Sequence, residues 1–217
     1  MGTASISSDG TAVERKQARL FRFLAVNLSC TFLLGAIFYA DPFHFWEHAL
    51  SELGTTITLF GKPNLASAVI ITLGTFINGR LMLEIARLYQ LNDSQPLTHY
   101  KSGLMYTASL GSFISIFPNN LFHLIHSIGT GLLIGSIFLF DLILLKEGFG
   151  SHPPTLIYFL AGILSFSVLS YAVTFFMGLQ IKQAAQKFCV INLLLILFQG
   201  NFHPRQADSP SAVHRPA

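Results

Sequence analysis

The residues best suited to chemistry lie in the segment 41–54, where histidine, serine and glutamate side chains follow one another closely. His44 and His48 are four residues apart, so on a helix their imidazole rings share one face and can chelate a metal ion. Zinc is the metal that such a histidine pair favours. The pair lacks the glutamate spacing of the zinc-protease motif, and the favoured interpretation is that it forms the polar face of a helix at a membrane surface.

Three further side chains of this segment are weak candidates for catalysis: Glu47, Ser51 and Glu52. Either glutamate could act as general base for a metal-activated water. Ser51 lacks the strained strand-to-helix turn in which a serine nucleophile is usually held. The favoured interpretation is therefore that Ser51 and Glu52 form hydrogen bonds with the turn 118–120 and hold the segment over the helices.

A second polar group lies at the turn 118–120 and in the apolar run that follows it. His123 and His126 are three residues apart and share one helical face, and Asn119 precedes them. A histidine inside an apolar run needs a polar partner or a ligand. Two sites are therefore possible predictions. One is a metal site formed by His44, His48, His123 and His126. The other is a ligand site formed by His48, Ser51, Glu52, Asn119 and His126.

The elements that must position these groups are membrane helices. The chain is 52% hydrophobic and only 11% charged, whereas a soluble domain carries about 25% charged residues. Runs of about 20 apolar residues predict an all-α, polytopic transmembrane bundle of about six helices. The expected organisation is a disordered basic N-terminus at 1–19, a transmembrane domain at 20–199 and a disordered C-terminal tail at 200–217.

The six helices are expected at about 20–40, 64–89, 102–117, 121–145, 155–179 and 188–198. The last run is only about half the length of a normal span. Its flanking lysines could extend to the interface and lengthen the span, so six helices are favoured over five. Between the first two, the segment 42–53 has apolar and polar residues on opposite sides of a helical projection. This pattern predicts a short amphipathic helix in the membrane interface, with Asp41 as its N-cap and Trp46 among the lipid headgroups.

Charge gives the expected orientation. Four basic residues precede the first apolar run, which places the N-terminus in the cytoplasm by the positive-inside rule; these are Arg15, Lys16, Arg19 and Arg22. The segment 41–54 and the turn 118–120 then share the outer face. The net charge of +3 lies mostly at the ends of the apolar runs. It therefore indicates membrane topology rather than a surface that binds nucleic acid. Within the bundle, Arg80 and Asp141 are expected at similar depth as a structural ion pair, unless Arg80 pairs with Glu84.

Three short motifs resemble a known family. They are Ser51-Glu52-Leu53-Gly54, Phe117-Pro118-Asn119-Asn120 and Ile125-His126. Together they resemble the membrane proteins grouped as domain of unknown function 998, which are similar to the DRAM and Sfk families. The resemblance covers roughly residues 20–199 and implies six membrane helices, but no established activity. An acidic residue often follows the proline of the turn in that family, and Asn119 departs from this.

Three functions are compatible with these residues. The first is an integral membrane protein, without catalysis, that recognises a lipid headgroup or small ligand at its extracytoplasmic face, with membrane lipids as its partners. The second is a metal-dependent intramembrane hydrolase of lipids, which requires at least three histidines to converge on one point. The third is a small-solute transporter, which requires a polar cavity near the middle of the membrane.

Overall fold

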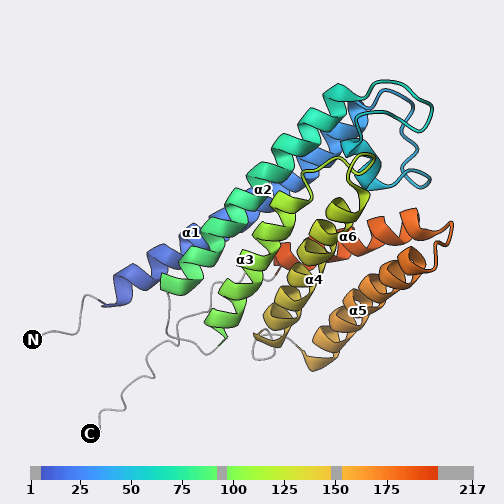
Figure 1. Ribbon diagram of the computed structural model, residues 1–217. Coiled ribbons are helices and arrows are strands. Elements are labelled where there is room, and N and C mark those ends of the chain that lie inside the picture. Colours follow the sequence, from blue (N-terminus) through green and yellow to red (C-terminus); the bar gives the residue numbers. More distant parts are fainter. Residues whose placement is uncertain (1–5, 92–96, 148–152, 200–217) are drawn as a thin grey trace, which may run out of the picture.

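The computed structural model describes residues 6–91, 97–147 and 153–199. Over these ranges the chain forms six α-helices and one short 3-10 helix, η1 (Figure 1). In chain order they are α1 (Ile6–Ile37), η1 (Leu50–Gly54), α2 (Leu65–Leu91), α3 (Thr98–Ile114), α4 (His123–Glu147), α5 (Pro154–Phe176) and α6 (Lys182–Gln199). The segment 38–64, which we call the cap, lies at one end of the bundle beside the turn between α3 and α4.

Four of these helices are long and apolar enough to cross a membrane. They are Arg15–Ile37 within α1, and the whole of α2, α4 and α5. This confirms the prediction of an all-helical integral membrane protein. The helices α2 to α5 begin and end within about four residues of the predicted bounds, because charged residues, prolines and glycines flank long apolar runs.

The first and last helices extend beyond their predicted limits. The expectation of disorder over residues 1–19 is wrong for the described part, since α1 already begins at Ile6. Extending a formed helix by one residue fixes far fewer dihedral angles than starting a new helix. The membrane-spanning part of α1 can therefore extend toward the N-terminus at low cost. The helix α6 begins at Lys182 rather than at 188. Residues 1–5 and the predicted tail 200–217 lie outside the described residues.

Small residues and serines bring α3 close to both of its neighbours. Three serine hydroxyls of α3 donate hydrogen bonds to backbone carbonyls of α2, each between 2.8 and 2.9 Å: Ser102 to Ala86, Ser109 to Gly79 and Ser112 to Thr75. On its other side, a Cβ added at Gly111 would lie 2.5 Å from the backbone nitrogen of Leu133 in α4. Close approach of this kind is how helices associate in lipid, where hydrophobic burial gives no driving force.

The apolar core lies between all six α-helices, and α5 contributes the fully buried Leu164. Its largest fully buried side chains include Phe21 of α1 and Phe140 of α4, whose ring centroids are 5.6 Å apart. The helix α6 contributes four buried side chains to the same cluster: Cys189, Leu193, Ile196 and Leu197. Its packing in this core explains why α6 is held in the bundle although it is not among the four long apolar helices.

The ion pair predicted between Arg80 and Asp141 is wrong. The Arg80 side chain is 53% exposed, and its Nη2 atom lies 4.0 Å from Glu84 Oε1, which was the alternative partner. Asp141 is completely buried, and neither carboxylate oxygen has a hydrogen-bond partner within the described part of the chain. The two residues do not meet because α3 packs between α2 and α4, and Arg80 lies at the surface whereas Asp141 lies inside the bundle. Near this end of the bundle, Lys101 of α3 instead pairs with Glu147 of α4.

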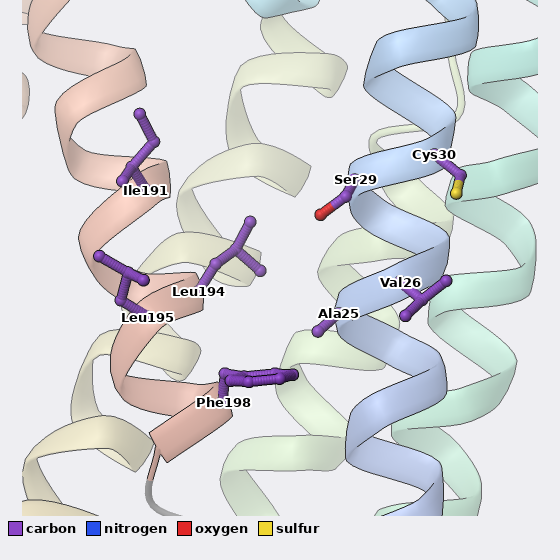
Figure 2. Close-up of a pocket in the computed structure, with 8 residues that line it drawn as sticks. All are labelled: Ala25, Val26, Ser29, Cys30, Ile191, Leu194, Leu195 and Phe198. Atoms are coloured by element: carbon purple, nitrogen blue, oxygen red, sulfur yellow. The ribbon is translucent and has the colours of Figure 1, made fainter.

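A crevice of about 360 Å³ lies between α1 and α6 (Figure 2). Leu194 and Phe198 of α6 point toward Ala25 and Ser29 of α1 across it. Its lining is almost wholly apolar. The residues of α1 that line it fall in the middle of the membrane-crossing stretch Arg15–Ile37, so the crevice lies at membrane depth.

Candidate functional site

The cap does not contain the predicted amphipathic helix. The backbone N–H of His44 donates to Nδ1 of His48 at 3.0 Å, and residues 45–47 form a turn rather than a helix. Only the single 3-10 turn η1 is helical. A side chain here satisfies a backbone N–H that a backbone carbonyl would satisfy in a helix. The distribution of apolar residues around a helical wheel does not reveal such a bond. Trp46 is 65% exposed, at the outer surface of this turn.

Asp41 forms an ion pair instead of capping a helix. Its Oδ1 atom lies 2.6 Å from Nζ of Lys62, which closes the cap from its first residues to its last. The Lys62 ammonium and a hydrogen bond with Thr58 hold the pKa of the Asp41 carboxyl below its ordinary value. Gly61 has φ +81°, a left-handed conformation that a side chain would strain, and it allows the tight turn between these partners.

Asn64 and Ser67 hold the cap onto the first two helices. The Asn64 side chain is 1% exposed and donates to the carbonyl oxygens of Leu53 and Thr55 at 3.3 and 2.9 Å. The Ser67 hydroxyl contacts the Leu53 carbonyl oxygen at 2.7 Å and that of Gly35 in α1 at 2.8 Å. These bonds fix η1 directly above the end of the α1–α2 pair.

Two side chains of α6 reach the cap from the opposite side. The backbone N–H of Leu50 donates to Oε1 of Gln186 at 2.9 Å, and the Gln186 amide donates to the Tyr171 hydroxyl of α5 at 3.4 Å. The Lys187 ammonium, 1% exposed as a residue, donates to the His48 carbonyl oxygen and also to that of Gln183 at 3.1 Å. The cap is thus connected to α5 and α6 as well as to α1 and α2.

A third connection joins the cap to the turn before α4. The backbone N–H of Thr56 donates to Oδ1 of Asn120 at 3.1 Å, and the Asn120 amide donates to the Thr56 hydroxyl at 3.0 Å. The sequence predicted a connection between the cap and this turn, but through Ser51 and Glu52. Thr56 makes it instead, and Oε2 of Glu52 is buried without a hydrogen-bond partner in the described part of the chain.

A cavity of about 310 Å³ lies beneath these connections, between α4, α5 and α6. Ser51 of η1, Asn119 of the turn and Gln186 of α6 line its capped end. The remaining lining comes from α4 and α5: His123, His126, Ser127, Thr130, Gly131, Ile134, Gly135, Val168, Tyr171, Ala172, Phe175 and Phe176. The cavity is partly open to the surroundings of the bundle.

The cavity brings together part of the predicted ligand site. Ser51, Asn119 and His126 line it, and His123 joins them. His48 and Glu52 are not among the described residues that line it. His48 is 6% exposed and packs against the rings of Phe43 and Tyr39 instead. Glu47 is exposed on the cap.

The four histidines do not form a common metal site. His44 and His48 stack on each other in the cap, with ring centroids 5.8 Å apart, while His123 and His126 line the cavity. Nδ1 of His123 lies 2.8 Å from Asn119 Oδ1, and Nδ1 of His126 lies 2.9 Å from the Phe117 carbonyl oxygen. No cluster of three or more His, Cys, Asp or Glu side chains with metal-binding geometry occurs among the residues that the structure describes.

The glycines of α4 divide between packing and the cavity. Gly131 and Gly135 have the four-residue spacing that often lets another helix approach, but a Cβ at either position would meet no atom within 4 Å. Both line the cavity. The close approach occurs at Gly129, where a Cβ would lie 2.5 Å from the backbone nitrogen of Ser115.

Sequence reasoning missed Tyr171 and Gln186, which form the wall facing the histidines. Tyr171 is one of many aromatic residues in an apolar run, and Gln186 lies ahead of the predicted start of the last helix. The run Gln180–Lys187 contains no helix-breaking residue, and this was the available signal that α6 begins early.

Comparisons of this chain with models of protein families, with curated proteins and with solved structures give no match. The resemblance to the domain of unknown function 998 family therefore stays a prediction. What the fold itself establishes is that the chain is an integral membrane protein with a helical bundle.

Proposed function

We propose that this protein binds a membrane lipid in the cavity beneath the cap, with the headgroup at the capped end. The observation that supports this is the division of the lining. Ser51, Asn119 and the two histidines lie at the capped end, whereas Ile134 of α4 and Val168 of α5 lie further from the cap and are apolar. Ligand pockets combine an apolar wall with a few polar groups that fix orientation in this way.

Substitution of a cavity glycine tests the proposal. A leucine at Gly131 has room to enter the cavity, since no atom lies within 4 Å of its Cβ position. Gly162 of α5 has the same free surroundings but does not line the cavity, so Gly162→Leu is the matched control. We expect native mass spectrometry to show a lipid retained by the wild-type protein and by Gly162→Leu but lost from Gly131→Leu. Equal retention in both variants would refute the proposal.

We also propose that the capped end faces the extracytoplasmic side. The basic residues Arg15, Lys16, Arg19 and Arg22 support this orientation through the positive-inside rule. A cysteine replacing the exposed Trp46, in a background with both native cysteines changed to alanine, is expected to react with a membrane-impermeant thiol reagent in intact cells. Labelling only after the membrane is opened would reverse the orientation.

The two other functions have less support. A metal-dependent hydrolase requires histidines that converge, whereas the cap pair and the cavity pair serve different contacts. A transporter requires a polar cavity near the middle of the membrane. On the α4 side, the polar residues of the cavity lie between the cap and the second turn of the helix instead: Ser51, Asn119, His123, His126, Ser127 and Thr130.

A further inference from the structure

The lining of the cavity holds hydrogen-bonding groups but no strong charge. Among the described residues that line it, none is Asp, Glu, Lys or Arg. A charged headgroup would leave water without gaining a counter-ion, which is costly inside a membrane protein. An uncharged headgroup that forms hydrogen bonds meets no such penalty.

One histidine of the cavity presents a hydrogen-bond acceptor. The side-chain oxygen of Asn119 can only accept, so Nδ1 of His123, 2.8 Å away, carries the proton of the ring. A neutral imidazole has one N–H, so Nε2 of His123 is left as an acceptor. The ring of His126 is held by the backbone instead, because it bonds to the Phe117 carbonyl oxygen at 2.9 Å and also to the backbone of Ser115.

Tyr171 supplies a donor on the opposite wall. Its hydroxyl oxygen accepts the hydrogen bond from the Gln186 amide at 3.4 Å, so the proton of the hydroxyl is free to be donated to a ligand. Gln186 is itself fixed, because its carbonyl oxygen accepts from the Leu50 N–H in the cap. An acceptor and a donor on facing walls match a hydroxyl group, which donates and accepts at once.

We infer that the cavity takes a single-chain, uncharged lipid whose headgroup carries hydroxyl groups, such as a monoacylglycerol. This inference rests on the proposed lipid-binding function. The hydroxyls donate to Nε2 of His123 and accept from Tyr171, while the acyl chain lies against Ile134 and Val168. The volume of about 310 Å³ is at the lower end for ligand pockets and suits one chain better than two.

Four probes with the same oleoyl-length chain test the headgroup: monooleoylglycerol, its dimethyl ether, oleate and oleylamine. Binding to the full chain in detergent micelles is measured by native mass spectrometry, and binding that persists in Gly131→Leu is subtracted. We expect monooleoylglycerol to bind about tenfold more tightly than its dimethyl ether, which cannot donate a hydrogen bond. Oleate and oleylamine are expected to bind more weakly still.

The outcomes separate the inference from the function on which it rests. Equal or tighter binding of oleate, oleylamine or the dimethyl ether, still sensitive to Gly131→Leu, overturns the hydroxylated headgroup and leaves lipid binding in place. Binding of no probe above the level of Gly131→Leu overturns both. Because the comparison changes the probe rather than the protein, a misfolded histidine variant cannot imitate either result.

Discussion

The contact between α3 and α4 allows a test in which two similar substitutions have opposite effects. At Gly111 an added Cβ would lie 2.5 Å from the Leu133 backbone nitrogen and 2.7 Å from the Gly129 carbonyl oxygen. Ordinary contacts begin near 3.4 Å, so the helices would have to separate by about 1 Å, which weakens their dispersion contacts. At Gly103, two turns earlier on the same helix, a Cβ would meet nothing within 4 Å.

The expected free energies follow from these distances. Alanine is about 1 kcal/mol better than glycine within a helix, so Gly103→Ala should stabilise the protein by about that amount. Gly111→Ala makes the same gain, but overpacking costs about 3 kcal/mol when the opposing atoms are backbone and cannot rotate away. For a chain of this size about 1 kcal/mol corresponds to about 2–4 °C in Tm. We expect Gly103→Ala to raise Tm by about 2–4 °C and Gly111→Ala to lower it by about 4–8 °C.

The assay is thermal melting of the purified protein in detergent, followed by circular dichroism at the helical band. Gly129→Ala, which would place a Cβ 2.5 Å from the Ser115 nitrogen, should behave like Gly111→Ala. If Gly111→Ala instead raised Tm as much as Gly103→Ala, the close approach of α3 and α4 would be incorrect.

The remaining predictions use the same melting assay. Lys187→Met should lower Tm by about 6 °C or more, because two hydrogen bonds from a buried ammonium contribute about 1.5–3 kcal/mol each; Lys182→Met on the same helix is the control and should change Tm little. Asp141→Leu should raise Tm, since it removes a buried carboxyl group that has no hydrogen-bond partner within the described chain; a lower Tm would reveal a partner. Because the pKa of folded Asp41 lies below its unfolded value, its stabilisation is complete above about pH 4 and is lost as the pH falls through the folded pKa. Wild-type Tm should therefore decline more steeply below pH 4 than that of Lys62→Met, and parallel declines would contradict the ion pair.

Much of the fold could be predicted because its signal is local. The helices α2, α4 and α5 are apolar runs long enough to span a membrane, and the residues that end them are adjacent in sequence. The cap was not predictable in this way. Its backbone N–H at Leu50 is satisfied by Gln186, a residue that is 136 positions away. A helical projection of 42–53 contains no information about such a partner.

The candidate site was predicted on one side only. Topology alone places the segment 41–54 and the turn 118–120 at the same end, and Ser51 and Asn119 do line one cavity. The facing wall depends on how α5 and α6 are rotated about their axes, which a single sequence does not specify. A single sequence also does not show that α3 packs between α2 and α4, which separates Arg80 from Asp141.

The dependence of α6 on the cap has a consequence for how the protein is assembled during synthesis. This helix falls outside the four that are apolar enough to enter a membrane by composition, and it carries Lys187 in a buried position. The carbonyl of His48 and the N–H of Leu50 bond to Lys187 and Gln186 of this helix. These two backbone groups are in position only after the cap has folded. The cap must therefore fold before α6 can pack against it. The last step of assembly is then the packing of α6 against folded protein, rather than its insertion into lipid as an independent helix.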